Sequence, residues 1–416
     1  MASMVWGGCD TVALAQEFGT PLYVMDENDI RSRCRRLVAA VKGRNARVCY
    51  AGKAFFNLAM ARIAAEEGLD VDIVSEGELY IAHKAGFPME RAILHGNAKT
   101  EEFLSLGLEW HAGTVVVDSE DELALLERLC EKENTRQKIL LRANPGIDAH
   151  TNTKIDTAQM DCKFGIPIAH IDRTVEKALK SKCLDLVGLH VNVGSQLQDT
   201  EAHMMAVDCM TGVISDLRNS LGFVARELDL GGGFGIPLMP GEPSIPADAF
   251  IGDMLDRVDE RCAKLGIARP VIIFEPGRWV VGEAGITLYT IQSIKTIPGV
   301  RTYVSVDGGM TDNPRPQLYQ AEYAVKLAND VDRPVTKRAA IAGPCCESGD
   351  LITKDTPVPE LHVGEVLAVP LTGAYNYSMF STYNCTRRPA VVFVKDGHAK
   401  VVVKRQSYED LVAGQI

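Results

Sequence analysis

One lysine in this sequence stands where its amine could react with a carbonyl group. Lys53 follows an apolar run in the segment YAGKAF. An amine at the end of a buried strand is partly desolvated, which favours its neutral, nucleophilic form. The ordinary alternative is a lysine whose stem covers apolar surface while its ammonium group reaches water. Lys53 is therefore a candidate nucleophile if other reactive groups gather around it.

A glycine run and a carboxylate are the next candidates. LGGGFG (230–235) could let backbone amides surround an anion such as a phosphate, although such a run is also a common flexible turn. Glu275 ends an apolar run in FEPGR, where an unpaired carboxylate would be costly. A protonated pyridine nitrogen would satisfy Glu275, and so would Arg278 in a structural ion pair. Both interpretations stay open on the residues alone.

Further side chains with suitable chemistry lie later in the chain. His190 in GLHVNVGSQ could lie flat against a planar ring, or it could be a hydrogen-bonded core residue. Ser195 could bind a phosphate or be an ordinary loop serine. CCESGD (345–350) places two thiols beside a carboxylate, although buried free cysteines usually serve packing. DNPRPQLY (312–319) and GAYNYSM (373–379) supply an arginine and tyrosines that could bind carboxylates or simply lie on the surface.

Eight short apolar runs alternate with helical patterns between Arg47 and Glu275, and they would position these residues. The strand-like runs are 47–52, 71–74, 92–95, 114–118, 138–143, 186–191, 226–231 and 271–275. Segments such as 57–67, 119–132 and 247–265 have apolar residues at three-to-four spacing, and Ser119 with Glu122 has the form of a capping box. This alternation predicts a parallel sheet covered on both faces, closed into a (β/α)₈ barrel, with a doubly wound sheet as the alternative.

Polar residues follow these runs with regularity. They are Lys53, Asp72 to Ser75, His95 with Asn97, Asp118, Asn144, His190, Gly231–Gly233 and Glu275. In a barrel the carboxyl ends of the strands meet at one rim, where active sites are built. We therefore expect the site at that rim.

After about Gly285 the sequence pattern changes to short strand-like runs separated by Pro, Gly and Asp turns. This predicts a second domain, an antiparallel β-sandwich or β-barrel, and TPLYVMDE (20–27) could join it. The expected domains are a barrel over 28–283 and a β domain formed by 1–27 and 284–416.

The composition narrows the class of protein. A chain of 416 residues with 46% hydrophobic and 24% charged residues fits two globular domains, and its net charge of −11 argues against nucleic acid or an anionic membrane as partner. No signal peptide or membrane span is visible. Eleven cysteines without paired spacing argue against a disulfide framework and against a metal site, which favours the reducing cytoplasm.

Together these motifs resemble the fold-type III pyridoxal-phosphate-dependent decarboxylases, and most closely those that act on diaminopimelate. The motifs that carry the resemblance span roughly residues 20–395 in the family's order: YAGKAF, DIVSEGELYIAHKAGFP, HGNAKT, HVNVGSQ, LGGGFGIP, EPGRWVVGEAG, DGGMTDNPRPQLY, CCESGD and TGAYNYSM. The resemblance implies an alanine racemase-like fold, a (β/α)₈ barrel with a C-terminal β domain, in agreement with the pattern above.

The resemblance also implies a cofactor, pyridoxal 5'-phosphate, and a role for each matching residue. Lys53 would carry it as a Schiff base, with Asp72 near that lysine, His190 stacked on the ring and Glu275 paired with the ring nitrogen. The residues implied to hold the phosphate are Ser195, Gly232, Gly233 and Tyr375, with Arg278 near the phosphate or a substrate carboxylate.

The implied reaction is decarboxylation of meso-2,6-diaminopimelate to L-lysine and CO2, the last step of lysine biosynthesis. Arg315, Tyr319 and Glu347 resemble residues that bind the far end of that substrate, with Arg278 and Tyr375 also near it. Cys346 resembles a general acid that in this family comes from the second subunit of a homodimer. The β domain would thus supply substrate and dimer-interface residues.

Three departures from the family pattern leave fine substrate preference open, at Ala98, Leu197 and Phe380. A related decarboxylase for ornithine, lysine or arginine stays possible, although Arg315, Tyr319 and Glu347 argue against it. A racemase of the same fold would place a cation where Glu275 stands. A cofactor-free regulator of a decarboxylase would not need Lys53 or Cys346.

Overall fold

The chain folds into two compact units in a computed structural model that describes residues 2–146, 161–237 and 239–416. The barrel unit comprises Arg33–Gly235 and Ile245–Trp279, and the β unit comprises Met1–Ser32, Ile236–Ser244 and Val280–Ile416. Compared with the predicted domains, the junctions lie a few residues away, and the segment 236–244 is grouped with the β unit.

Eight parallel strands close the barrel. They are β4 (Ala46–Ala51), β5 (Asp70–Ile73), β6 (Ala92–Leu94), β7 (Thr114–Val117), β8 (Gln137–Asn144), β10 (Leu184–His190), β11 (Glu227–Asp229) and β12 (Val271–Phe274). The order is β10-β11-β12-β4-β5-β6-β7-β8, and pairing of β8 with β10 completes the circle, with β9 (Ile166–Pro167) added beside β8. Each strand coincides with a run predicted from the sequence. The closed circle rules out the doubly wound sheet.

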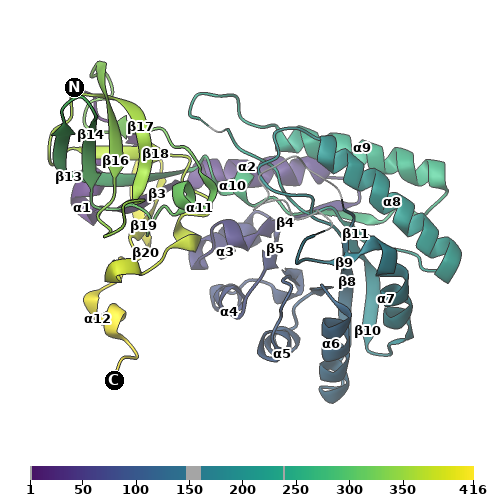
Figure 1. Cartoon of the computed structure of the whole chain (residues 1–416). Coiled ribbons are helices and arrows are strands. Elements are labelled where there is room, and N and C mark those ends of the chain that lie inside the picture. The colour runs from purple at the N-terminus through teal and green to yellow at the C-terminus, as the bar shows by residue number, and fades with distance from the viewer. Residues whose placement is uncertain (1, 147–160, 238) are drawn as a thin grey trace. The chain divides into compact units, whose positions relative to one another are not determined.

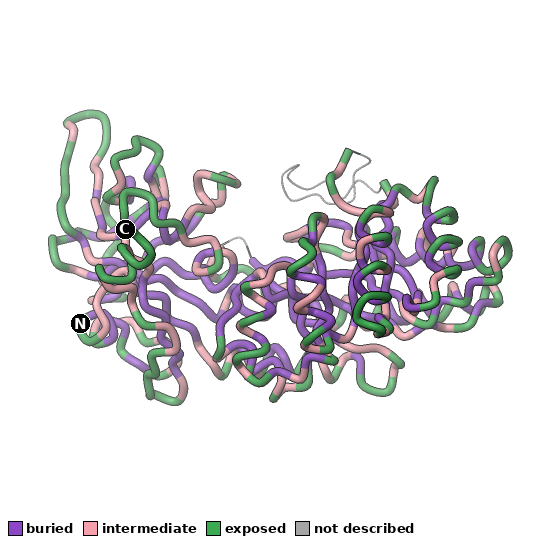
Figure 2. Tube along the Cα trace, turned by 90° about the horizontal axis from the view of Figure 1, so that it is seen from below, coloured by how far each residue is buried: buried purple, intermediate pink, exposed green. Residues whose placement is uncertain are grey.

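Helices surround these strands (Figure 1). They are α2 (Glu27–Val41), α3 (Leu58–Glu66), α4 (Glu76–Ala85), α5 (Glu101–Glu109), α6 (Glu120–Lys132), α7 (Ile168–Lys180), α8 (Glu201–Leu221), α9 (Ala247–Leu265) and the short α10 (Arg278–Val281). Strands covered by helices outside and by side chains inside are buried on both faces, which explains their continuous apolar character. Figure 2 shows this as buried chain inside the barrel unit and exposed chain on its surface.

The barrel interior is filled by side chains from six of the strands. Cys49, Ile93, Val116, Leu140, Val187 and Ile273 form one buried cluster. A packed interior of this kind leaves the ends of the strands as the place for polar chemistry.

Polar caps start the helices that follow the first four strands. Asn57 accepts hydrogen bonds from the backbone N–H groups of α3, and Ser75, Thr100 and Ser119 do so for α4, α5 and α6. Each cap satisfies N–H groups that the first turn of a helix leaves without a partner. The short βα connections are therefore fixed, and with them the residues that precede each helix.

The predicted capping box at Ser119 is half present. Ser119 Oγ accepts from the backbone N–H of Glu122, as expected. The Glu122 carboxylate forms a buried ion pair with Lys99 Nζ at 2.7 Å. Lys99 Nζ also donates to the backbone carbonyl of Val116 at 2.6 Å. The lysine of HGNAKT thus ties the loop after β6 to β7 and α6.

The β unit contains a mostly antiparallel sheet and a separate two-stranded sheet formed by its first two strands. Its strands are β1 (Val5–Trp6), β2 (Cys9–Asp10), β3 (Leu22–Asp26), β13 (Gly285–Ile297), β14 (Arg301–Val306), β15 (Lys326–Leu327), β16 (Val335–Ala342), β17 (Leu351–Pro359), β18 (Val366–Pro370), β19 (Ala390–Lys395) and β20 (His398–Val403). The main order is β17-β16-β14-β13-β3-β19-β20, so the N-terminal segment 20–27 does join this sheet. The expectation of a purely antiparallel domain needs correction, because β14 pairs with β16 and β3 with β19 in parallel.

Long β13 bridges the two halves of the β unit. One buried cluster contains Tyr289 and Ile291 of this strand, and a second contains Ile286 and Leu288. Three short helices complete the unit, α1 (Thr11–Phe18), α11 (Arg315–Tyr319) and α12 (Tyr408–Val412). Within the described part of the chain, no helix has the length and apolar character needed to cross a bilayer.

Candidate active site

Six neighbouring strands of the barrel each deliver a reactive side chain to the same rim. In the order of the strands these are His190 at the end of β10, Asp229 at the end of β11, Glu275 after β12, Lys53 after β4, Asp72 in β5 and His95 after β6. Residues that lie up to about 220 positions apart in sequence thus converge because the strands run parallel and in register. The structure thus brings these barrel residues together at one rim, and their roles in a site stay a prediction.

Lys53 lies in a turn of 3₁₀ helix, Gly52–Ala54, directly after β4. Two carboxyl groups, those of Asp72 and Glu78, lie within electrostatic range of it. Asp72 is buried, and burial raises its pKa, while the charges of His95 and Lys53 act against the rise. Burial likewise raises the pKa of Glu78 to about 7. The lysine therefore stands beside acidic groups on a largely dry rim.

Glu275 lies at the centre of this cluster with 5% of its surface exposed. Its Oε1 is 2.7 Å from His95 Nε2, and its Oε2 is 3.3 Å from His190 Nε2. Burial by itself would raise the pKa of Glu275, but the two imidazoles hold the pKa well below its usual value. Glu275 is accordingly an ionised carboxylate in a dry site.

His190 is fully buried at the end of β10. Burial lowers the pKa of His190 to about 3, although its contact with Glu275 acts in the opposite direction. The ring therefore stays neutral at physiological pH. Its edge faces the His95 ring, with 4.9 Å between the centroids and an angle of 71°.

The glycine loop after β11 is constrained by its neighbours. A Cβ atom on Gly231 would lie 2.6 Å from the Val191 carbonyl oxygen, and φ of Gly231 is +68°. A Cβ on Gly232 would lie 2.1 Å from the carbonyl oxygen of Glu275. Gly233 has φ +90°, where L side chains are strained. The run is thus required by close backbone approach and is not a flexible turn.

Two polar side chains accompany this loop. Arg278 Nη2 donates to Ser195 Oγ at 3.3 Å, which brings together two residues predicted near the phosphate. His203 of α8 contacts the Gly232 carbonyl at 2.9 Å and stacks on Phe234. The stacked pair of His203 and Phe234 therefore supports the glycine loop. A Cβ atom on any of its three glycines would occupy the space beside the loop backbone.

His95, His190, Asp229 and Glu275 also have side chains of types that bind metal ions, and their ligand atoms lie within 4.8 Å of one another. Two ligands of one tetrahedral zinc ion are about 3.4 Å apart, since each bond is about 2.1 Å long. The 2.7 Å distance between His95 Nε2 and Glu275 Oε1 is shorter than that separation. The spacing of this pair is therefore too short for two ligands of one tetrahedral zinc ion.

The β unit brings together another set of predicted residues. The Arg315 guanidinium of α11 lies over the Tyr319 ring, 5.2 Å from its centroid, and over the Tyr375 ring at 5.8 Å. The side-chain amide of Gln317 donates to the carbonyls of Gly349 and Leu351, so α11 is joined to the CCESGD segment.

The CCESGD segment is an exposed turn with a buried anchor. Asp350 is 3% exposed and accepts hydrogen bonds from the backbone N–H groups of Cys345 and Met310. Cys346 and Glu347 are exposed, and the Cys346 N–H donates to Asn384 Oδ1 at 2.9 Å. Arg315, Tyr319, Tyr375, Cys346 and Glu347 thus belong to one unit, and Lys53, His190 and Glu275 to the other.

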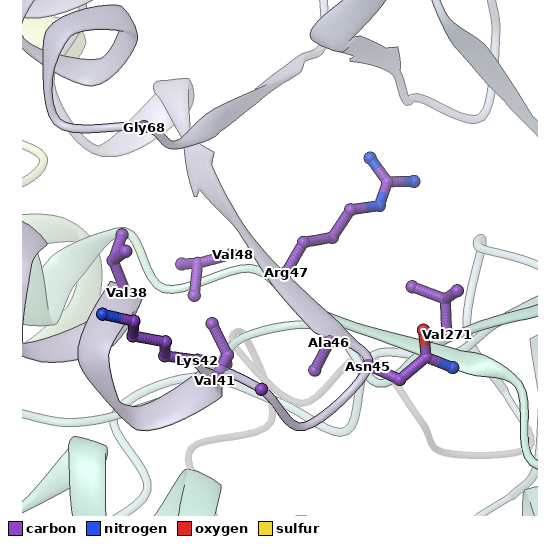
Figure 3. Close-up of a pocket in the computed structure, with 10 residues that line it drawn as sticks. Val38, Val41, Lys42, Asn45, Ala46, Arg47, Val48, Gly68 and Val271 are labelled. Atoms are coloured by element: carbon purple, nitrogen blue, oxygen red, sulfur yellow. The ribbon is translucent and has the colours of Figure 1, made fainter.

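A cavity of about 350 Å³ lies at the other end of the barrel strands. Val38 and Val41 of α2 and Lys42 directly after it line the cavity, together with the starts of β4 and β12. In Figure 3 the Arg47 side chain points away from Lys42, and its guanidinium pairs with Asp70 and Glu227. This cavity holds none of the predicted site residues, so it is not the active site.

Three residues at the rim received no role from the sequence. His95 was expected at the rim but nothing indicated that it contacts Glu275. Asp229 lay inside an apolar run, and a carboxylate in a buried strand is the signal that could have identified it. Glu78 lay in a helical pattern, where nothing distinguished it from a surface glutamate.

The rim suits pyridoxal 5'-phosphate. It offers a lysine amine, an ionised buried carboxylate for a pyridinium nitrogen, and a glycine cradle beside Ser195 and Arg278 for a phosphate. Asp72 Oδ1 is also buried without a hydrogen-bond partner, as expected of a group that waits for a polar ligand. Residues 27–282 match the family described as pyridoxal-dependent decarboxylase, pyridoxal binding domain. The fold and the rim therefore define a fold-type III decarboxylase that uses pyridoxal phosphate.

Relatives narrow the class further. The chain is 46% identical to the diaminopimelate decarboxylase of Bacillus subtilis over 98% of this chain and 93% of that protein. The crystal structure of diaminopimelate decarboxylase from M. jannaschii superposes with a TM-score of 0.90 at 32% identity, covering 100% and 97% of the two chains. That of the Helicobacter pylori enzyme complexed with L-lysine gives 0.89 at 31% identity, covering 97% and 98%. The chain belongs to the diaminopimelate decarboxylase family, whose members convert meso-diaminopimelate to lysine.

The lysine/ornithine decarboxylase among the matched structures is less similar to this chain in sequence and in fold. A lysine/ornithine decarboxylase from Vibrio vulnificus is 21% identical with a TM-score of 0.77, which shows a common fold and no more. The relatives named diaminopimelate decarboxylase, at up to 46% identity, favour that activity over the alternative substrates considered from the sequence.

Proposed function

We propose that this chain releases CO2 from meso-2,6-diaminopimelate to give L-lysine, with Lys53, Glu275 and His190 as the residues that hold the cofactor. The observation that carries this assignment is the delivery of six reactive side chains from six neighbouring strands to one buried rim. When bound, the protonated pyridine ring of pyridoxal phosphate accepts the electron pair that the departing carboxylate leaves behind.

Each rim residue has a defined part in this scheme. Lys53 would hold the cofactor through its Nζ amine and would release it to the amine of the substrate. Glu275 would keep a proton on the pyridine nitrogen, because its carboxylate is ionised and buried. His190 would lie against the ring as a neutral imidazole, because burial lowers its pKa to about 3, and it would place no positive charge beside a protonated ring. Asp72 stabilises the lysine ammonium when the amine is released.

The phosphate is assigned to the glycine loop. The N–H groups of Gly232 and Gly233 and the hydroxyl of Ser195 would bind its oxygens, with Tyr375 of the β unit as a further ligand. Arg278 serves the phosphate or a substrate carboxylate, and its hydrogen bond to Ser195 supports a place close to the former. A cradle of backbone amides suits a dianion in a protein of net negative charge.

The far end of diaminopimelate carries an ammonium group and a carboxylate. Arg315 suits the carboxylate, since its guanidinium is already oriented by the rings of Tyr319 and Tyr375. Glu347 suits the ammonium group and is exposed on its turn. Replacing Arg315 with alanine should raise KM for diaminopimelate, whereas Arg301→Ala, which removes an arginine stacked on Tyr303, should not.

Cys346 is proposed as the acid that protonates the carbon after CO2 leaves, supplied by the second subunit of a homodimer. An exposed thiol on a turn anchored by buried Asp350 is suited to reach a neighbouring molecule. All cysteines in the described residues are free, which agrees with a reducing compartment, and we place the enzyme in the cytoplasm.

The decisive experiment measures CO2 release by the purified, pyridoxal-phosphate-loaded chain. Meso-diaminopimelate, lysine, ornithine and arginine are supplied in parallel, and lysine is quantified as product. We expect release from diaminopimelate alone, with lysine formed in equal amount. Release only from lysine, ornithine or arginine would replace the substrate assignment.

A pair of lysine variants tests the site. Lys53→Ala should lose turnover and the absorbance of the lysine-bound cofactor together. Lys42→Ala removes a lysine at the opposite end of the barrel and should leave both unchanged. A Lys53→Ala enzyme that still turns over would overturn the assignment.

A further inference from the structure

The glycine loop is held at each of its three carbonyl groups. The oxygens of Gly231 and Gly233 accept backbone N–H groups of neighbouring segments, at 2.8 and 2.9 Å. The oxygen of Gly232 lies 2.9 Å from Nε2 of His203, which stands in the first turn of α8. A side chain therefore does at Gly232 what the backbone does at the two neighbouring glycines.

This contact shows which nitrogen of His203 carries a hydrogen. A carbonyl oxygen only accepts hydrogen bonds, so Nε2 must be the donor. The other ring nitrogen, Nδ1, is buried and has no hydrogen-bond partner among the residues that the structure describes. Burial lowers the pKa of His203, although the carbonyl groups of Gly232 and Asp199 act against the shift. The ring is therefore neutral, with its single N–H directed at the glycine loop.

The orientation of the imidazole is fixed by its surroundings. The side chain of His203 is fully buried. Its ring stacks on Phe234, with 4.8 Å between the centroids and 10° between the planes. Phe234 follows the glycine run directly and forms a parallel bridge with Leu197. A histidine that only filled space would not need to place its N–H on a carbonyl group of this loop.

The hydrogen bond to the Gly232 oxygen also sets the direction of the next N–H group. The C=O of Gly232 and the N–H of Gly233 belong to one planar trans peptide unit, in which they point in opposite directions. Holding the oxygen towards α8 therefore turns the Gly233 N–H away from that helix. Within the described part of the chain, neither this N–H nor that of buried Gly232 donates a hydrogen bond. Buried N–H groups are seldom left unpaired, and adjacent free donors of this kind suit an anion.

We infer that His203 is a positioning residue for the phosphate site, because its Nε2–H fixes the Gly232–Gly233 peptide with the Gly233 N–H facing the phosphate. The inference rests on the proposed role of the glycine loop in binding the phosphate of the cofactor. A hydrogen bond at the carbonyl also polarises the peptide unit and strengthens its N–H as a donor. His203 thus acts through the peptide and need not touch the cofactor.

Three substitutions at His203 separate the N–H group from the ring. His203→Phe keeps a ring that can stack on Phe234 and removes the N–H. His203→Gln places an amide N–H at the same number of bonds from Cα as Nε2, whereas in His203→Asn the amide is one bond too short to reach the oxygen. His83→Phe is the matched control, since it replaces an exposed histidine that stacks on Trp110.

The measurement compares two ligands that differ in the phosphate group. Pyridoxal phosphate and pyridoxal are titrated into the cofactor-free protein, and binding is followed by the absorbance of the lysine-bound form. We expect His203→Phe to raise Kd for pyridoxal phosphate about tenfold, which corresponds to about 1.4 kcal/mol, and to leave Kd for pyridoxal unchanged. His203→Asn should match His203→Phe, and His203→Gln should recover most of the loss. The phosphorus NMR signal of bound pyridoxal phosphate should shift in the same two variants, while His83→Phe should behave as wild type.

Three outcomes would overturn the inference. These are wild-type affinity for pyridoxal phosphate in His203→Phe, equal losses for the two ligands, or a His203→Gln variant that binds no better than His203→Asn. Should His203→Phe fail to fold, the glutamine and asparagine variants still decide the question, because they differ by one methylene group. Failure of the proposed function is distinguishable, since the wild-type protein would then bind pyridoxal phosphate no better than pyridoxal, or release no CO2 from diaminopimelate.

Discussion

Substituting Gly232 tests whether the close backbone approach between the glycine loop and Glu275 is required for stability and activity. A Cβ at this position would lie 2.1 Å from the Glu275 carbonyl oxygen and 2.9 Å from its carbonyl carbon. Both atoms are backbone, so neither can rotate away. Gly232→Ala must therefore separate the loop from the end of β12 by about 1 Å, at a cost of about 1–3 kcal/mol in stability, as for other overpacked sites.

The consequence for activity follows from the same displacement. Glu275 and the phosphate loop would move relative to each other, so one cofactor could not satisfy both. A displacement of about 1 Å at a catalytic group costs about 100-fold in rate. We expect Gly232→Ala to show that loss in kcat for CO2 release at saturating pyridoxal phosphate, together with a weaker affinity for the cofactor.

A matched control lies in the same unit. A Cβ atom on Gly212 of α8 would meet no heavy atom within 4 Å beyond its own stretch of helix, so Gly212→Ala is sterically free. It should raise stability by about 0.5–1 kcal/mol, because alanine restricts the unfolded chain and favours the helix, and it should leave kcat unchanged. Gly232→Ala with kcat within threefold of wild type (about 0.6 kcal/mol in the barrier) and unaltered cofactor affinity would refute the steric argument.

Three further predictions concern a buried ion pair, a buried histidine and the shared site. Lys99→Met leaves Glu122 buried without its cation and should destabilise the enzyme in urea unfolding by about 3–5 kcal/mol, with Lys99→Met/Glu122→Gln recovering part of it. His190 has a pKa of about 3 in the folded state, below its value in the unfolded chain, so its contribution is fully present above pH 6.5 and is lost as the pH falls. Between pH 6.5 and 5 the free energy of unfolding of the cofactor-free protein should therefore fall by about 2 kcal/mol, a slope that His190→Phe removes. Finally, mixing the inactive variants Lys53→Ala and Cys346→Ala should restore about one quarter of wild-type activity, because half of the dimers are mixed and each mixed dimer regains one of its two sites.

Each of these has an outcome that contradicts it. If Lys99→Met lowers the free energy of unfolding by less than about 1 kcal/mol, the Glu122 carboxylate must become hydrated in the variant. An unchanged pH slope in His190→Phe would assign the acid sensitivity to other groups. No recovery in the mixture, with subunit exchange verified, would place Cys346 and Lys53 of one site on the same chain.

The barrel was predictable because its signals are local. Buried parallel strands are apolar on both faces, and helical segments between them show three-to-four spacing, so the eight runs could be read one at a time. The β unit was less predictable. Parallel pairing of β14 with β16 and of β3 with β19 depends on which strands meet, and no residue within a strand encodes its partner.

The same division applies to the site. Lys53, the glycine run and Glu275 were found from the sequence, because an amine, three consecutive glycines and a carboxylate at the ends of apolar runs are unusual there. Glu122 shows the opposite case. Its spacing from Ser119 indicated a cap, but Lys99, 23 residues earlier, competes for its carboxylate through a buried ion pair.

The sequence by itself determined the strands, the helices, the reactive side chains and the class of chemistry, because each depends on the character of a short stretch of chain. Only the tertiary structure decided that the side chains of His95, Asp229 and Glu275 lie together, and that Arg315 lies on Tyr375. These residues are 46 to 180 positions apart, and their contacts exist only because the barrel closes and the turns of the β unit meet. Closure is a property of the whole packed chain, so no local pattern reports it.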